Sequence, residues 1–236
     1  MCRLVTNTYM PSNSFKFYRY DLVCPPIKWS QEFKNPEYVY EGEWEALKIK
    51  NQIGAFFFFD NKSTAYITGC KAAKNRTNQI WLTCTSIIKK TSLLDISHFT
   101  NISSILLAFD ELGIDVLNDR FFKFNAFSAC KSFKELRILI DKLRVINNMG
   151  KKDNKMAEEE RDLVYEIGAF FGNNDRIDYF GQLLTDFNNG IEFKNLLIGK
   201  GYNGYIFKES YTSPTYCVFD YSVLSEPVVE NFKIHE

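Results

Sequence analysis

The sequence has no long apolar run and no segment typical of export. No stretch approaches the roughly 20 apolar residues of a membrane-spanning helix, and Met1–Met10 lacks the apolar core of a signal peptide. We therefore expect a soluble protein with no membrane contact. It would act in the cytoplasm of its own cell or be delivered into the cytoplasm of a target cell.

The sequence also lacks clustered metal ligands and a net charge. Its six cysteines form no Cys-x-x-Cys pair, and its two histidines, His98 and His235, are far apart. Because a zinc site needs clustered thiolates or imidazoles, we expect reduced, mostly buried cysteines and no metal. The 29 basic and 29 acidic residues cancel, which removes a global field as a driver of nucleic-acid binding. No acidic cluster with metal spacing indicates a nuclease.

Aromatic residues are abundant. The chain has 236 residues, of which 45% are hydrophobic and 16% are aromatic, including 22 Phe and 13 Tyr. This length suits one domain over residues 1–236 with one sizeable core, and the composition predicts that much of this core is aromatic.

The first β-rich run covers residues 15–23 and contains a charged residue among aromatics. Alternation puts Phe17 and Arg19 on one face of this strand and Tyr20 on the other. A buried charge there needs a partner or an anionic ligand. The alternative is an edge-strand arginine that points at water.

Further β-rich runs follow near the middle and at the end of the chain. Residues 53–59, with four consecutive phenylalanines, predict a strand buried on both faces, and Asp60 or Asn61 can cap a helix after it. Residues 79–88 predict another strand and residues 93–97 continue the pattern. Near the C-terminus, residues 200–209 and 216–221 indicate a hairpin-like pair of strands.

A helical region of about residues 100–195 separates these β-rich blocks and is expected to be an insertion. Apolar spacing predicts a helix over 104–117, and Ser132 with Glu135 forms a capping box. The helix that follows should contact the core through Leu136, Leu139 and Leu143. The polar residues 151–155 predict a loop. Further helices are expected from about Ala157, over 175–189 and over 191–198.

Four of these segments, in this order, resemble the core of ADP-ribosyltransferase-like domains of phage and bacterial toxins. The matching segments are the arginine-bearing strand, the phenylalanine-rich strand with its capped helix, residues 79–97, and the closing pair of strands with Gly201-Tyr-Asn-Gly204 and Tyr216-Cys-Val-Phe-Asp220. The resemblance covers about residues 15–97 and 196–225. It implies an α+β fold with a split β-sheet core.

The resemblance also implies a reaction and a set of site residues. Such enzymes transfer ADP-ribose from NAD, which is a substrate, through a transition state with oxocarbenium character. By this analogy Arg19 would hold a phosphate, and Ser63 or Thr64 would lie near the ribose. The aromatic candidates for the nicotinamide pocket are Tyr20, Phe58, Tyr66 and Tyr202.

The sequence departs from the family pattern at one position. A glutamate usually precedes the last core strand, and Thr215 stands there instead. Glu209, or an acid of the Glu41–Glu45 segment, could supply the carboxylate. Alternatively, the fold is retained without transferase activity.

Two classes of function therefore remain. The first is a mono-ADP-ribosyltransferase that acts as a toxin, an effector or a phage-defence component. It would modify a protein or nucleic-acid acceptor, and an antitoxin or immunity protein is a candidate partner. The second is a catalytically inactive module of the same fold that acts as an adaptor or immunity protein.

Overall fold

A computed structural model describes residues 7–11, 15–25, 27–30, 55–117, 132–171, 180, 184, 189–208 and 213–234. All other residues, among them Glu209 and the Glu41–Glu45 segment, lie outside the described part. The strands are β1 (Asn7–Tyr9), β2 (Lys16–Asp21), β3 (Phe56–Phe59), β4 (Gln79–Ser86), β5 (Leu93–Asp95), β6 (Gly204–Lys208), β7 (Pro214–Val218) and β8 (Val228–Lys233). The helices are α1 (Lys62–Ala73), α2 (Ile102–Glu111), α3 (Phe133–Asn148), α4 (Asn154–Phe170), α6 (Asn189–Gly199) and the 3-10 turn η2 (Tyr221–Val223).

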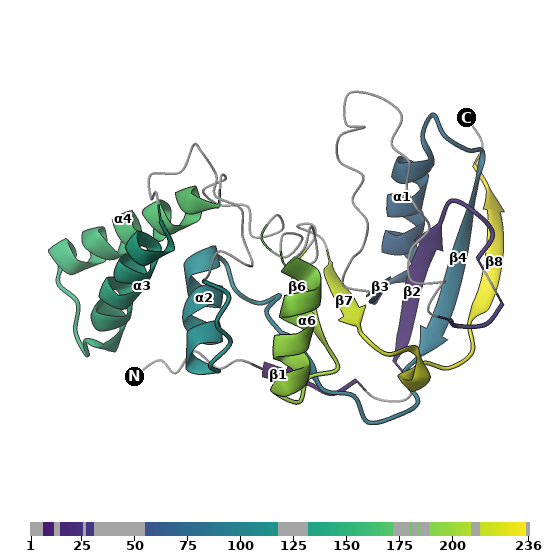
Figure 1. Ribbon diagram of the computed structural model, residues 1–236. Helices are drawn as coiled ribbons and strands as arrows, with labels where there is room; N and C mark the ends of the chain where they lie inside the picture. Colours follow the sequence, from purple (N-terminus) through teal and green to yellow (C-terminus); the bar gives the residue numbers. More distant parts are fainter. Residues whose placement is uncertain are drawn as a thin grey trace.

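The eight strands form one sheet in the order β1-β5-β6-β7-β3-β2-β4-β8, and only β5 and β6 pair in parallel. In Figure 1 the sheet occupies the right and centre, while α2, α3 and α4 extend to the left. Strands from both ends of the chain therefore share one sheet, because β7 pairs directly with β3. The fold is α+β, as expected.

The described strands form one continuous sheet, and this sheet has a narrow junction. The ladder between β2 and β3 contains a single register pair, Tyr18 and Phe59. By contrast, β2 pairs with β4 over six successive positions, from Lys16 with Ser86 to Asp21 with Trp81. The strands β2, β4 and β8 are thus joined to the strands β1, β5, β6, β7 and β3 through this single register pair.

The sheet has two chemically different faces. Tyr18, Phe59 and Thr215 follow one another across β2, β3 and β7, so their side chains share one face, which we call the helical face. The helices α1, α2, α3, α4 and α6 contribute residues to the two hydrophobic clusters on this side. The opposite face carries Phe17 and Phe58, and we call it the aromatic face. No α-helix of the described residues contributes to its hydrophobic cluster.

Helix starts follow the capping chemistry that the sequence contains. Asn61, one of the two expected caps, accepts hydrogen bonds from the backbone N–H groups of Ser63 and Thr64 at 2.8 and 3.2 Å. Ser132 accepts from the N–H of Glu135 at 3.2 Å, which confirms the expected start of α3. Helix α4 begins at Asn154, inside the polar stretch expected to be a loop, because Asp153 caps it through the N–H of Met156.

The helices that separate the two β-rich blocks share a core with the sheet. Leu136 and Leu143 of α3 are buried, and Leu139 packs against the same cluster, which also contains Tyr205 and Phe207 of β6. This face of α3 is buried, as expected, but it packs on α2 and α4 and reaches the core of the sheet only through the cluster that these helices share with it. Helix α2 ends at Glu111, earlier than expected, and Gly113 follows it with a φ of +65° that favours glycine. The helix expected over 175–189 falls mostly outside the described residues.

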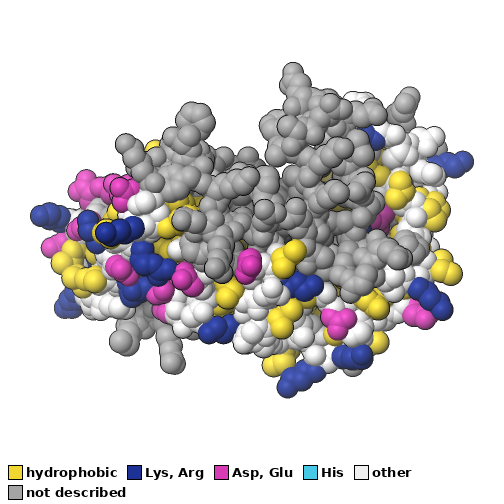
Figure 2. All heavy atoms as spheres, in the orientation of Figure 1, with side chains coloured by type: hydrophobic (Ala, Val, Ile, Leu, Met, Phe, Trp, Pro, Cys, Tyr) yellow, Lys and Arg dark blue, Asp and Glu magenta, His cyan; other side chains and the backbone are white. Residues whose placement is uncertain are grey.

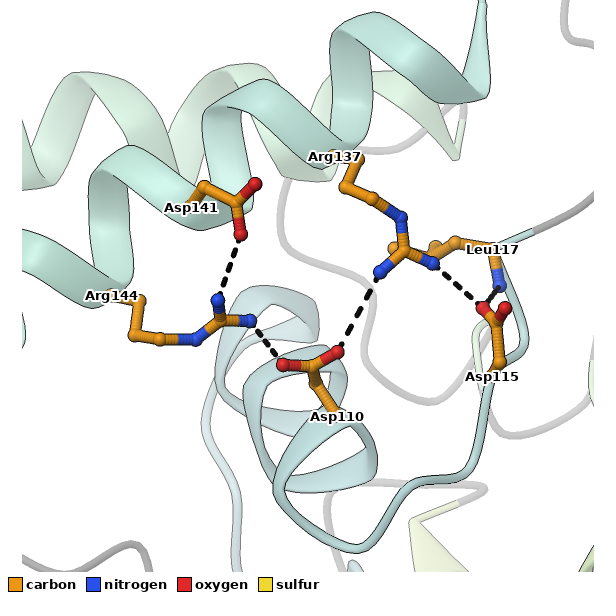
Figure 3. Close-up of polar contacts among 6 residues, drawn as sticks. All are labelled: Asp110, Asp115, Leu117, Arg137, Asp141 and Arg144. Atoms are coloured by element: carbon orange, nitrogen blue, oxygen red, sulfur yellow. Dashed lines mark hydrogen bonds and ion pairs between the residues drawn. The ribbon is translucent and has the colours of Figure 1, made fainter.

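Ion pairs join α2 to α3 on the surface of the helical part (Figure 3). Asp110 of α2 contacts Arg144 and lies 3.6 Å from Arg137, while Asp115 accepts from Arg137 at 2.7 Å. Arg144 also pairs with Asp141 of its own helix at 2.8 Å. These residues are partly exposed, so the ion pairs contribute little stability. They orient α2 and α3, whose stability comes mainly from the buried side chains.

Candidate functional site

Arg19 is buried on the aromatic face and pairs with an acid of its own strand. Only 6% of Arg19 and 2% of Asp21 is exposed. The guanidinium donates from Nε to both carboxylate oxygens at 3.0 and 3.2 Å, and from Nη2 to Oδ1 at 2.8 Å. Burial raises the pKa of Asp21, and the charge and hydrogen bonds of Arg19 oppose this rise. The edge-strand alternative for Arg19 is wrong, because β2 lies between β3 and β4.

Two further polar groups on β4 lie beside this pair. Thr83 is the register neighbour of Arg19, and Trp81 is the register neighbour of Asp21. Thr83 is fully buried. The Thr83 hydroxyl and the Trp81 indole N–H are both buried without a hydrogen-bond partner. The ion pair therefore belongs to a larger polar patch in an otherwise aromatic layer.

Rings of four strands and a loop meet next to this patch. Phe17 lies 5.8 Å from Phe58 and 5.1 Å from Tyr216, measured between ring centroids. Tyr216 also lies 5.7 Å from Phe15 and 6.0 Å from Tyr9. These separations are typical of interacting aromatic pairs. The cluster runs continuously from β2 to β1.

Two carboxylates lie at the far end of this aromatic cluster. The charges of Asp60 and Asp95 both raise the pKa values of Tyr9 and Tyr216, after the larger effect of burial. Burial also raises the pKa of Asp60. Asp95 accepts hydrogen bonds from Ser97 N and Oγ at 2.9 and 2.7 Å, and His98 Nδ1 lies 3.8 Å from it. The aromatic face thus has a buried cation at one end and acids with phenols at the other.

The residues expected to line one site are divided between the two faces. Arg19 and Phe58 lie on the aromatic face. Tyr20 stacks on Phe59 with a centroid distance of 6.5 Å and contacts α1 near Gly69, on the helical face. The remaining described candidates also lie away from Arg19: Ser63, Thr64 and Tyr66 belong to α1, Tyr202 packs against the helical core, and Thr215 is buried on the helical face. Glu209 is outside the described residues.

Sequence reasoning missed the second half of the site. Tyr9, Asp60, Asp95 and Tyr216 were not expected to act together, and they come from four separate segments. One signal was available. Phe58 and Asp60 are two residues apart, and Tyr216 belongs to the quoted closing motif, but only the register between β3 and β7 brings them to one face.

Other parts of the molecule offer weaker candidates for a functional site. A shallow hollow of about 390 Å³ on α3 is lined by Leu117, Phe133, Lys134, Arg137, Ile138 and Asp141. Figure 2 shows Lys and Arg side chains interspersed with Asp and Glu over the helical part at the left. Among the residues that the structure describes, no group of three or more His, Cys, Asp or Glu could hold a metal ion. None of the described helices is long and apolar enough to cross a membrane.

Comparisons with known proteins add no relative to this picture. No protein-family model, curated protein or solved structure matches the chain.

Proposed function

We propose that this protein transfers ADP-ribose from NAD to a macromolecular acceptor. The observation that carries the proposal is the adjacency of β2, β3 and β7, which puts Arg19, Phe58 and Tyr216 on one face. These are the strands that the resemblance to ADP-ribosyltransferase-like domains requires to share a site. A toxin, effector or phage-defence role follows from the same resemblance.

The reaction breaks the bond between nicotinamide and the anomeric carbon of the ribose. A nucleophilic atom of the acceptor takes this carbon and gives up its proton, and neutral nicotinamide leaves. The chain has to hold the dinucleotide in position and stabilise positive charge on the sugar. Arg19 and the polar patch on β4 suit the polar part of NAD, and the rings suit its bases.

The acid that supports the developing cation is assigned to Asp60. It follows Phe58, the register partner of Tyr216, by two residues, which puts it on the aromatic face, and it forms no ion pair with a described residue. Thr215, at the place of the usual glutamate, faces the opposite side. Among the described carboxylates of this face, Asp21 is held by Arg19 and Asp95 by Ser97.

A second candidate function is an interaction module without transferase activity. It is favoured by the three hydrogen bonds between Arg19 and Asp21, because these give the guanidinium a carboxylate partner within the fold. A structural arginine of this kind needs no ligand anion.

Incubation of the full chain with labelled NAD and a cell lysate tests these alternatives. Label on protein or nucleic acid supports transfer, and free ADP-ribose alone indicates glycohydrolase activity. Asp60→Asn should lower either activity by roughly a hundredfold, as for loss of one preorganised electrostatic group. Glu230→Gln, an exposed acid paired with Lys62 at 2.7 Å, is the matched control. An inert wild-type protein favours the interaction module.

A further inference from the structure

The part of the chain that forms α1 and β4 has an uneven distribution of charge. Although the chain is neutral overall, no Asp or Glu occurs between Asp60 and Asp95. The charged residues of this stretch are all basic: Lys62, Lys71, Lys74, Arg76, Lys89 and Lys90. Of these, Lys62 pairs with Glu230 of β8 at 2.7 Å. A neutral protein with such a stretch has a local positive potential in this part of its surface.

The fold gathers four cations at one end of the sheet, a surface that we call the basic end: Lys71, Lys74, Arg76 and Lys233. Lys71 lies in the last turn of α1, and Lys74 caps the C-terminus of this helix. Arg76 belongs to the turn that leads to β4, and Gln79 at the start of β4 is the register partner of Lys233 in β8. Figure 1 shows this turn and the end of β8 together at the upper right.

The basic end faces solvent, and three of its cations have no acidic partner in the described part of the chain. All four residues are exposed. Lys71, Lys74 and Lys233 form no ion pair with a described residue. By contrast, the arginines of α3 in Figure 3 are paired with aspartates. The unpaired lysines therefore leave positive charge available to an anionic partner.

The dipole of α1 accounts for only part of this arrangement. The partial negative charge at a helix C-terminus favours cations in the last turn, which explains Lys71 and Lys74. It does not explain Arg76 or Lys233, which lie outside the helix. Lys71 and Lys74 are also three positions apart on one helix, where two like charges repel each other. Helix stability alone therefore does not require this set of cations.

The residues between these cations indicate the kind of anion. The turn residues 74–78 contain no apolar side chain, and Asn75 and Asn78 are exposed. Asn75 adopts a φ of +64°, a left-handed conformation that asparagine tolerates better than most residues. Lysines interspersed with amide and hydroxyl groups are typical donors to the phosphates and sugars of nucleic acids. A membrane-binding surface needs large apolar side chains among its cations instead.

We propose that the basic end binds the sugar–phosphate backbone of a nucleic acid. Lys71, Lys74 and Lys233 contact phosphates as point charges, and Asn75 and Asn78 supply neutral donors. RNA and DNA both offer this chemistry. As the acceptor of ADP-ribose, this partner rests on the proposed function, but its binding requires neither NAD nor turnover.

Fluorescence anisotropy of the full chain with labelled oligonucleotides tests the proposal. The probes are an oligoribonucleotide of mixed sequence, the matching oligodeoxyribonucleotide and the matching DNA duplex. We expect at least one probe to bind. Its affinity should fall roughly 20- to 150-fold between 50 and 200 mM salt, as for the release of counterions from three to four phosphates.

Two variants with the same change in net charge assign the binding to this surface. The test variant combines Lys71→Gln, Lys74→Gln and Lys233→Gln. The control combines three substitutions at exposed lysines of the helical part, Lys142→Gln, Lys151→Gln and Lys155→Gln. The test variant should bind at least about tenfold more weakly and reduce the slope of log affinity against log salt by about 2 to 3. The control should retain the wild-type affinity and slope.

Three results would overturn the inference. They are no binding of any oligonucleotide by the wild-type protein at 50 mM salt, an equal effect of the two triple variants, and binding of phosphatidylglycerol–phosphatidylcholine vesicles in place of oligonucleotides. A preference among the bound probes identifies RNA or DNA as the source. Lysine-dependent binding by a protein that leaves labelled NAD intact would retain this inference and reject the transferase. Transfer of label to protein by a chain that binds no oligonucleotide would do the reverse.

Discussion

At the scale of single residues, the ion pair between Arg19 and Asp21 decides how the aromatic face is stabilised. Both side chains are nearly inaccessible and make three hydrogen bonds to each other. Truncation of Arg19 leaves the Asp21 carboxylate buried without this guanidinium. The pair therefore has to be studied as a unit.

Arg19→Ala should lower the free energy of unfolding by about 3 to 5 kcal/mol, because it leaves the Asp21 carboxylate buried without its guanidinium partner. Urea denaturation of Arg19→Ala, Asp21→Ala and the double variant measures the coupling. The double variant should lose much less than the sum of the single variants. Additive losses would mean that the two groups do not depend on each other. Lys62→Ala, which breaks an exposed pair with Glu230, is the control and should change stability little.

Tyr216 gives the protein a sensitivity to alkaline pH. Burial, followed by the charges of Asp60, Tyr9 and Asp95, raises the pKa of Tyr216 in the folded state. An unfolded tyrosine loses its proton near pH 10, while the folded one retains it. Stability is therefore complete below about pH 10 and falls as the pH rises further. Tyr216→Phe should reduce this fall in denaturation experiments at pH 9 and pH 11. An identical pH dependence in the variant would contradict the assignment.

The sequence predicts that Arg19 and Tyr20 lie on opposite faces of their strand. It does not predict which of them shares a face with Thr215. Alternation within one strand is local, and it correctly separated the two faces of β2. Whether a residue of β7 shares a face with Arg19 depends on the registers of β2 with β3 and of β3 with β7. A shift of one residue in either ladder would exchange the faces. The local pattern carries no information on these registers.

At the scale of secondary-structure elements, the sequence predicted capped helices and central strands well and edge strands poorly. The caps Asn61 and Ser132 lie where their side-chain chemistry predicts. Strands β1 and β8, at the two edges of the sheet, were missed. Strand β1 has only three residues. Strand β8 is mostly exposed, and in it Val228 and Val229 are followed by Glu230 and Asn231. Without a buried face, neither strand shows the alternation of apolar and polar residues.

The packing of α1 on β2 depends on Gly69. A Cβ atom at this position would lie 2.9 Å from the Cβ of Tyr20 and 3.2 Å from Cδ1 of Ile80. Gly69→Ala should therefore lower the free energy of unfolding by about 1 to 3 kcal/mol, despite the better helix propensity of alanine. Gly150→Ala is the matched control, since nothing lies within 4 Å of its added Cβ. Thermal unfolding of both variants measures the difference, and equal melting temperatures would show that α1 shifts without cost.

At the scale of the whole molecule, one hydrophobic cluster joins the helical part to the sheet. It contains Leu143 of α3, Ile167 of α4, Phe193 of α6 and Tyr205 of β6. The single domain over residues 1–236 stays a prediction. The helices α2, α3 and α4, which extend away from the sheet in Figure 1, all contribute side chains to this cluster.

The shared core predicts one cooperative unfolding transition. Far-ultraviolet circular dichroism reports the helices, and in a Trp44→Phe background tryptophan fluorescence reports the sheet through Trp29 and Trp81. Both signals should change at the same temperature.

Leu143→Ala, at a position that is 2% exposed, should lower both midpoints together and reduce the free energy of unfolding by about 2 to 5 kcal/mol. Val145→Ala, at a neighbouring position that is 58% exposed, should move neither by more than about 1 °C. If Leu143→Ala lowered only the dichroism midpoint, the helical part would unfold independently of the sheet, and a docking or regulatory role for it as a separate unit would then become the better interpretation.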